Sequence, residues 1–228
     1  NMRVAYITDD VYLKHETGAM HPESPQRLRS INKAIESLLE SLIFRSPISV
    51  SERILELVHP PEHIDMIRRM SEYGGSIDSD TICSNDSFDA ATMAVGAGVV
   101  ALNSIKSGEF ERAFCAVRPP GHHATPVQAM GFCLFNNIAI AARYAQIVGY
   151  EKVMIIDFDV HHGNGTQETF YEDDTVFYFS SHQAYAYPGT GAESERGKGK
   201  GEGFTANFLM MPGSGDSELF EIYADQLP

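Results

Sequence analysis

Acidic and imidazole side chains directly follow one apolar stretch of the chain. Residues 153–156, V-M-I-I, lead into Asp157, Asp159 and His161. Alternate side chains of a strand share a face, and open parallel sheets place ligands beyond the carboxyl ends of their strands. Two carboxylates and an imidazole that converge without a cation would be costly. Their mixed donors suit zinc, with iron or cobalt as alternatives. We therefore expect a divalent metal site here. The competing interpretation is a solvated strand end with incidental acids.

A second group that could carry chemistry is the adjacent pair His122 and His123, in R-P-P-G-H-H-A at 118–124. Neighbouring imidazoles do not easily chelate one metal from the same face, so this pair fits general acid/base work better. A third group is G-F-C-L-F-N-N at 131–137. Its Phe132 lines a pocket or caps the core, and the sequence leaves these two interpretations open.

Strands and helices alternate in the sections that must position these groups. Apolar runs predict strands at 4–7, 113–117, 153–156, 176–180 and 205–211. Helical spacing predicts helices at 24–42, 61–73, 88–105 and 137–148, and an amphipathic segment at 217–227. This order predicts an α/β fold with a mostly parallel sheet and helices on both faces. Without a repeat or a dividing linker, one domain is expected over 1–228.

Composition narrows the class of protein. The 228 residues are 43% hydrophobic and carry a formal net charge of −14, which argues against non-specific nucleic-acid binding and is compatible with cationic substrates. We expect no stretch apolar and long enough to span a membrane, so the cytoplasm is the expected location. The three cysteines have neither disulfide-scaffold nor zinc-ribbon spacing, and Cys83, Cys115 and Cys133 are expected to be inert thiols.

Together, five stretches in this order resemble the histone deacetylase superfamily, which includes bacterial deacetylase-like amidohydrolases and acetylpolyamine deacetylases. They are H-P-E-S-P-Q-R, R-P-P-G-H-H-A, G-F-C-L-F-N-N, D-F-D-V-H-H-G-N-G-T-Q and Y-P-G-T-G, between residues 21 and 191. The resemblance implies an arginase/deacetylase-like fold, an open and mainly parallel sheet with helices on both faces.

The resemblance also implies roles for individual residues. Asp159 and His161 match two of the family's three zinc ligands. The implied catalytic residues are the tandem His122 and His123, Asp157 as the partner of the first, and Asn164 as the partner of the second.

Further positions match substrate and ion contacts of the family. Phe132 and Tyr187 match the aromatic walls of the acyl-lysine channel, and Gly131 matches the residue whose carbonyl faces the substrate. Asp80 lies near the family's rim aspartate. The residues that lie where many members hold a structural potassium ion are Asp157, Asp159, His161 and Ser180.

One departure from the family pattern concerns the C-terminal part. The family's third zinc-ligand Asp and its oxyanion-stabilising Tyr belong to motifs that do not occur in this sequence. We therefore expect 1–228 to be the N-terminal two thirds of a catalytic domain, truncated and inactive alone. A complementary C-terminal fragment or a second copy of the chain would complete it.

The expected function is zinc-dependent removal of an acetyl or other acyl group from lysine or another primary amine. Acetylated lysine proteins, acetylpolyamines and small N-acetylated amines all fit, with no direct nucleic-acid or membrane partner. The alternative is a non-catalytic module that binds acylated ligands or a protein partner. A di-manganese arginase-type hydrolase is disfavoured, because its D-x-H-x-D order differs from the D-x-D-x-H found here.

Overall fold

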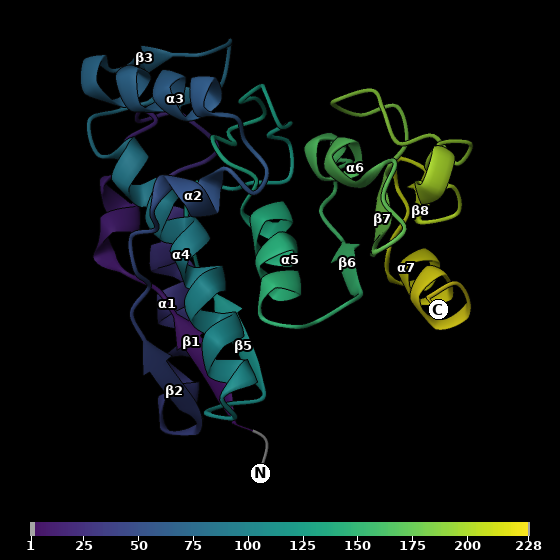
Figure 1. The fold of residues 1–228 in the computed structure, drawn as a ribbon, viewed down its shortest axis with the longest axis horizontal. Helices are drawn as coiled ribbons and strands as arrows, with labels where there is room; N and C mark the ends of the chain where they lie inside the picture. The colour runs from purple at the N-terminus through teal and green to yellow at the C-terminus, as the bar shows by residue number, and fades with distance from the viewer. Residues whose placement is uncertain (1–2, 228) are drawn as a thin grey trace. The chain divides into compact units, whose positions relative to one another are not determined.

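The computed structural model of the protein describes residues 3–227. The chain divides into two compact units, Asn1–Gly149 and Tyr150–Pro228 (Figure 1). Each unit has its own three-stranded parallel sheet. This division does not test the single catalytic domain expected over 1–228, which stays a prediction.

The first unit contains a parallel sheet in the order β2-β1-β5, with Val4 of β1 opposite Leu42 and Arg112. The short strands β3 and β4 form a separate antiparallel pair. The elements of this unit are β1 (Val4–Ile7), η1 (Asp10–Lys14), α1 (Pro25–Ala34), η2 (Ile35–Ser41), β2 (Leu42–Arg45), α2 (Glu52–Leu55), α3 (Pro61–Tyr73), β3 (Gly75–Ser76), β4 (Ile82–Cys83), α4 (Ser87–Lys106), β5 (Arg112–Cys115) and α5 (Asn137–Ile147).

The second unit contains a parallel sheet in the order β6-β7-β8. The buried Phe179 of β7 packs against β8 and α7: its ring lies 4.8 Å from that of Phe208 and 5.6 Å from that of Tyr223. The elements of this unit are β6 (Val153–Asp157), α6 (Asn164–Phe170), β7 (Val176–Gln183), η3 (Gly199–Gly201), β8 (Thr205–Met210) and α7 (Asp216–Asp225).

The predicted α/β class with mainly parallel strands is confirmed, but one predicted helix is too long. The helix expected over 24–42 ends at Ala34 and continues as the 3-10 helix η2. The next residue, Leu42, begins β2 and pairs with β1. Apolar periodicity extended past the true helix end because tertiary strand pairing overrides local helical spacing.

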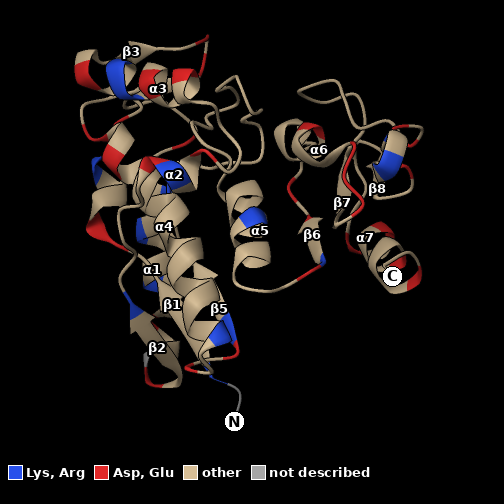
Figure 2. Cartoon of the chain, in the orientation of Figure 1, with Lys and Arg blue, Asp and Glu red and all other residues tan. Residues whose placement is uncertain are grey.

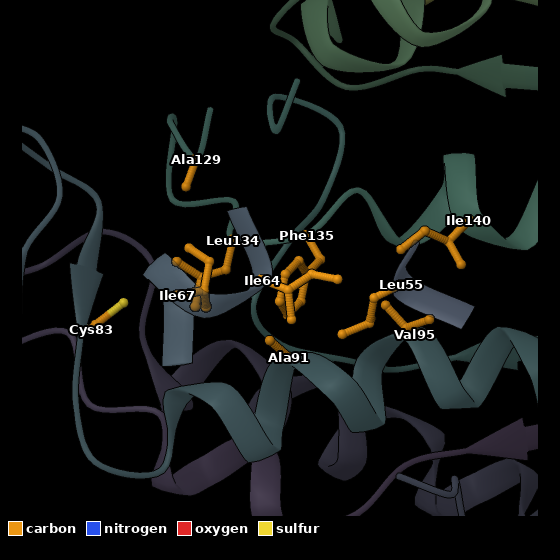
Figure 3. Packing of buried hydrophobic residues seen from close by; sticks show 10 residues of the cluster. All are labelled: Leu55, Ile64, Ile67, Cys83, Ala91, Val95, Ala129, Leu134, Phe135 and Ile140. Carbon is orange, nitrogen blue, oxygen red and sulfur yellow. The ribbon is translucent and has the colours of Figure 1, made fainter. Parts of the chain in front are cut away.

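The central helix of the first unit, α4, packs against β1, β5 and α5. Its Gly96 is required by close approach, because a Cβ there would lie 1.7 Å from the carbonyl oxygen of Ile48. By length and composition α4 could cross a membrane, contrary to expectation, but half of its most apolar window is buried inside the protein. Figure 3 shows one core cluster of this unit, in which Ala91 and Val95 of α4 meet Phe135.

A buried ion pair joins two distant segments of the first unit. Arg118 is fully buried, and its Nε and Nη2 both donate to the carboxylate of Glu23 at 2.6 Å. Its Nη1 donates to the carbonyl of Tyr12 at 2.6 Å. Because Arg118 begins R-P-P-G-H-H-A, this pair fixes the start of the double-histidine loop.

A second buried connector is His59, between α2 and α3. Its Nε2 accepts a hydrogen bond from the backbone N–H of Asn136 at 2.9 Å, so its Nδ1 carries the proton and donates to the carbonyl of Pro126 at 3.0 Å. Burial first, and the neighbouring His63 second, lower the pKa of His59 to about 3. The neutral ring therefore ties the loop that precedes α5 to the helical layer.

The Glu23–Arg118 pair predicts a large loss of stability when one charge is removed. Glu23→Gln leaves the buried Arg118 without its counter-charge and is expected to lower the free energy of unfolding by about 3–5 kcal/mol. Urea denaturation measures this. The matched control is Glu111→Gln, which removes the exposed Arg3–Glu111 pair and is expected to change the free energy of unfolding very little. Equal losses in the two variants would contradict the assigned importance of the buried pair.

The His59 geometry predicts acid sensitivity. The unfolded histidine takes up a proton below about pH 6.5, whereas the folded one stays neutral until about pH 3. The unfolded state therefore binds more protons in this window, and stability falls by about 1.4 kcal/mol per pH unit from this group as pH decreases. The free energy of unfolding is measured by urea titration at several pH values between 4.5 and 7.5. Its fall with decreasing pH is expected to be less steep in His59→Gln, by about that amount below pH 6.5. An unchanged slope would show that His59 does not carry the effect.

Candidate functional site

The double-histidine loop follows β5 and is held against the start of α5. A Cβ on Gly121 would lie 2.5 Å from the backbone nitrogen of Asn137, so only glycine permits this approach. The side-chain amide of Asn137 donates to the carbonyl of Pro119 at 3.0 Å. The loop is therefore attached to α5 at one end and to Glu23 at the other.

The two adjacent histidines differ in exposure. His123 is 4% exposed and His122 is half-buried, and their ring centroids lie 4.0 Å apart at 47°. A Cβ on Gly131 would lie 2.5 Å from Cδ2 of His123, so the backbone of Gly131 packs directly on that ring. Two of the motifs found in the sequence thus meet within the first unit.

Phe132 has an unusual backbone conformation that its neighbours maintain. Its φ of 70° follows a φ of 55° at Gly131, and a non-glycine residue in this region is strained. The backbone N–H of Phe132 donates to Oγ1 of the buried Thr81 at 3.2 Å. The ring of His21 lies edge-on to the Phe132 ring at 4.8 Å. Sequence reasoning did not find Thr81, because a lone threonine carries no signal of this role.

Asp80 lies beside the same group of residues. Its carbonyl accepts a hydrogen bond from Nε2 of His21 at 2.8 Å, and the backbone N–H of Glu23 donates to Nδ1 of His21 at 3.1 Å. Burial first, and the hydrogen bond with Asp78 second, raise the pKa of the Asp80 carboxyl. The structure thus brings Asp80, His21 and Phe132 together, and their proposed contacts with substrate stay predictions.

In the second unit, one expectation from the sequence is wrong: Asp157, Asp159 and His161 do not share one face of a strand. Strand β6 ends at Asp157, so strand alternation does not orient Asp159 and His161. Instead, the backbone N–H of Asp159 donates to Oδ1 of Asp157 at 3.2 Å. The backbone N–H of His161 donates to Oδ1 of Asp159 at 2.7 Å. These side-chain-to-backbone bonds turn the chain, which a purely extended interpretation cannot anticipate.

Asp159 and His161 nevertheless lie together. Nδ1 of His161 is 3.5 Å from Oδ1 of Asp159, and the two side chains are 43% and 49% exposed, respectively. Over residues 3–227, no group of three or more His, Cys, Asp or Glu side chains is arranged to hold a metal ion. The described part of the chain therefore offers one carboxylate and one imidazole, a donor pair that suits zinc.

The other acid of this motif, Asp157, contacts the sheet. Its Oδ2 accepts a hydrogen bond from the hydroxyl of the buried Tyr178 at 3.0 Å. Burial first, and the charge on Asp157 second, raise the pKa of Tyr178. Ser180 lies opposite Asp157 in the register of β6 and β7. Asn164 begins α6 immediately after the loop.

Tyr187 lies next to the predicted metal ligand. Its ring is 42% exposed and stands at 85° to the ring of His161, with 6.0 Å between centroids. The next residue after His161, His162, is only 1% exposed. Burial first, and the nearby His182 second, lower the pKa of His162 to about 4. The buried residues around His162 were not anticipated, because glutamine, asparagine and threonine form no recognisable spacing.

The three cysteines are free thiols. Cys83 and Cys133 are buried and Cys115 is half-buried. Burial raises the pKa of Cys83 to about 11 and that of Cys115 to about 11 as well. Protonated thiols are poor nucleophiles, which agrees with the inert role expected from the sequence.

Charge is unevenly distributed in the second unit. Figure 2 shows acidic residues and no basic ones along α7. Basic residues gather instead at 196–200, where Lys198 pairs with Glu172 at 3.2 Å. Both side chains of that pair are well exposed, so the interaction contributes little to stability.

Comparison with known proteins identifies the family. The model of the histone deacetylase domain matches residues 21–228. The chain belongs to the histone deacetylase domain family. A protein of Archaeoglobus fulgidus named "Probable deacetylase" is 42% identical over 220 residues, covering 94% of this chain and 61% of that protein. The histone deacetylase-like amidohydrolase of Pseudomonas aeruginosa is 35% identical over 235 residues, covering 93% and 62%.

A solved structure of this family has the same fold. The crystal structure of the HDA15 HD domain superposes with a TM-score of 0.87 at 39% identity, covering 91% of this chain and 62% of that one. The chain thus spans about 61–62% of the length of these histone deacetylase relatives. The matched range includes every candidate residue described above, and their individual roles remain predictions.

The contact between Thr81 and Phe132 gives a local prediction for this family member. Thr81→Val keeps the shape but removes the acceptor of the Phe132 N–H, which is expected to cost about 1–3 kcal/mol. Hydrogen exchange at the Phe132 amide should accelerate by about tenfold or more. Thr81→Ser retains the hydroxyl and should preserve protection. Identical exchange in the valine variant and the wild type would contradict the assigned role.

Proposed function

We propose that this protein is a zinc-dependent amidohydrolase that removes an acetyl or other acyl group from lysine or another primary amine. Membership of the histone deacetylase domain family supports the proposal, as do relatives named as deacetylase and amidohydrolase. The observation that carries it is the exposed Asp159–His161 pair just beyond β6, where a parallel sheet presents its ligands.

The chemistry of this donor pair fits the proposed metal. A carboxylate and an imidazole are both common zinc ligands, and their partial exposure leaves room for further ligands. Asp159 and His161 would hold the ion, with iron or cobalt as chemical alternatives. When bound, such an ion supplies Lewis-acid chemistry, which polarises an amide carbonyl and makes water more acidic. A structural potassium ion near Asp157 and Ser180 is part of the same proposal.

The protein's own residues would carry the proton transfers. His123 would accept a proton from the attacking water and later donate one to the departing amine nitrogen. His122 would stay largely cationic and stabilise developing negative charge. Asp157 and Asn164 would act as the partners of His122 and His123, respectively. The buried position of His123 against Gly131 limits its motion, as a positioned acid/base requires.

The proposed substrate is an acylated amine with a slender, apolar chain. Phe132 and Tyr187 would provide aromatic walls, Gly131 a carbonyl contact and Asp80 a carboxylate at the rim. The net charge of −14 favours substrates with further positive charge, such as basic peptides that contain acetyl-lysine or acetylpolyamines. Small N-acetylated amines belong to the same chemical class.

Two variants of the complete protein test this function in parallel. Asp159→Ala removes a proposed ligand and is expected to lose bound zinc, measured by elemental analysis after equilibration with the metal. His123→Ala should retain zinc but reduce turnover of an acetyl-lysine peptide by about a hundredfold or more. Removal of metal with a chelator should abolish wild-type activity, and added zinc should restore it.

Contrasting results would redirect the assignment. Full zinc stoichiometry in the Asp159 variant would remove Asp159 from the ligand set. Near-wild-type turnover in the His123 variant would exclude His123 as the proton carrier. Saturable binding of an acetyl-lysine peptide without any turnover by the zinc-loaded protein would support a non-catalytic binding module instead.

A further inference from the structure

A continuous chain of buried polar side chains links two loops of the second unit. One loop carries Asp159 and His161, and the other carries Tyr187. His162, Gln167 and Asn207 are 1%, 8% and 4% exposed, respectively. Nδ1 of His162 lies 2.8 Å from Oγ1 of Thr190, and its Nε2 lies 3.0 Å from Oε1 of Gln167. Nε2 of Gln167 donates to Oε2 of Glu195 at 2.5 Å.

Donors and acceptors allow only one orientation of this chain. Glu195 is an acceptor, because its carboxylate also receives the backbone N–H of Gly191 at 3.0 Å and of Ala192 at 3.1 Å. Gln167 must therefore turn its amide NH2 toward Glu195 and its carbonyl toward His162. That carbonyl also accepts from Nδ2 of Asn207 at 2.7 Å. It follows that Nε2 of His162 carries the proton and Nδ1 accepts the hydroxyl of Thr190.

The hydrogen-bonded side chains are also closely packed against the loop that carries Tyr187. A Cβ on Gly191 would lie 2.5 Å from Cγ of His162 and 2.5 Å from Nε2 of His182. Nε2 of His182 in turn donates to the carbonyl of Gly191 at 3.0 Å. The loop at 187–195 is thus pressed onto the His162 ring and bonded to it at Thr190. His161 precedes His162 in one loop, and Tyr187 lies in the other loop. The ring centroids of these two exposed residues are 6.0 Å apart.

We propose that His162, Gln167 and Glu195 are positioning residues that fix His161 and Tyr187 relative to each other. They would set zinc affinity through the backbone of His161 and acyl-chain recognition through the loop that carries Tyr187. This inference rests on the proposed function. Its physical basis is that a ligand held in place by satisfied buried hydrogen bonds pays less ordering cost on binding, and loss of such outer contacts typically weakens metal binding 10–100-fold.

Gln167→Glu tests the proposal, because it places a second carboxylate against that of Glu195. The zinc dissociation constant, measured by competition with a chromogenic chelator, is expected to rise about tenfold or more. The reciprocal double variant Gln167→Glu/Glu195→Gln restores a donor–acceptor pair between the two side chains with reversed polarity. It should recover part of the affinity, because the Glu195 oxygen that the swap replaces with an NH2 also accepts the N–H of Gly191. Glu172→Gln, in the exposed pair with Lys198, is the control for loss of one carboxylate, as in the Glu195→Gln half of the double variant, and should leave zinc affinity unchanged.

A milder variant keeps the test valid if Gln167→Glu fails to fold. Thr190→Val removes only the exposed hydroxyl that donates to His162, and a severalfold loss of zinc affinity is expected, with recovery in Thr190→Ser. Circular dichroism at the assay temperature verifies that each variant is folded. Folded variants whose zinc affinity stays within twofold of wild type would overturn the positioning role.

The outcomes separate this inference from the proposed function. Zinc binding by the wild type that is lost in Asp159→Ala but unaffected by Gln167→Glu and Thr190→Val overturns only the positioning role. Failure of the wild type to bind zinc overturns both. Weakened binding in Gln167→Glu with rescue by the reciprocal swap supports the positioning role, because a purely structural contact would change the unfolding midpoint and leave zinc affinity intact.

Discussion

The ion pair between Glu23 and Arg118 is the constraint on which the arrangement of the first unit depends. A buried guanidinium needs hydrogen-bond acceptors at fixed positions around it. Here one carboxylate and one carbonyl provide them. The geometry holds η1, the segment just before α1 and the loop after β5 at one point. The double-histidine loop can therefore be irregular without being loose, because its first residue is anchored and Gly121 fits closely against α5.

The second unit holds its loops with neutral amide and imidazole side chains together with the carboxylate of Glu195. Its metal-ligand candidates lie in a turn after β6, where strand geometry no longer orients them. Side-chain-to-backbone bonds shape the turn, and buried amide and imidazole groups support it from behind. The exposed pair of Asp159 and His161 thus lies in a turn that hydrogen-bonded buried side chains support. Exposed candidate ligands above buried hydrogen bonds suit the proposed metal site, which would take an ion from solvent and still keep a defined shape.

Local patterns predicted much of this, and long-range contacts account for most of the remainder. Apolar runs identified the main parallel strands. Motif spacing gave His122, His123, Asp159 and His161 as candidates, and their roles stay predictions. The pairing of Glu23 with Arg118 spans 95 positions, and that of Asn207 with Gln167 spans 40, so no local pattern reveals either. The end of α1 was missed because β2 competes for the same apolar residues. The seven-residue helix α6 is too short to show a periodicity.

The buried imidazoles give histidine a second use in this protein. A neutral ring donates at one nitrogen and accepts at the other, so it can join two backbone segments much as a peptide unit joins neighbouring strands. His21 and His59 show this directly, each receiving a backbone N–H while facing a carbonyl. Of the nine histidines, three are candidates for chemistry: His122, His123 and His161. The other six each form a hydrogen bond within their own unit. Most histidines of this protein therefore hold parts of the fold together, and only a minority are candidates for catalysis.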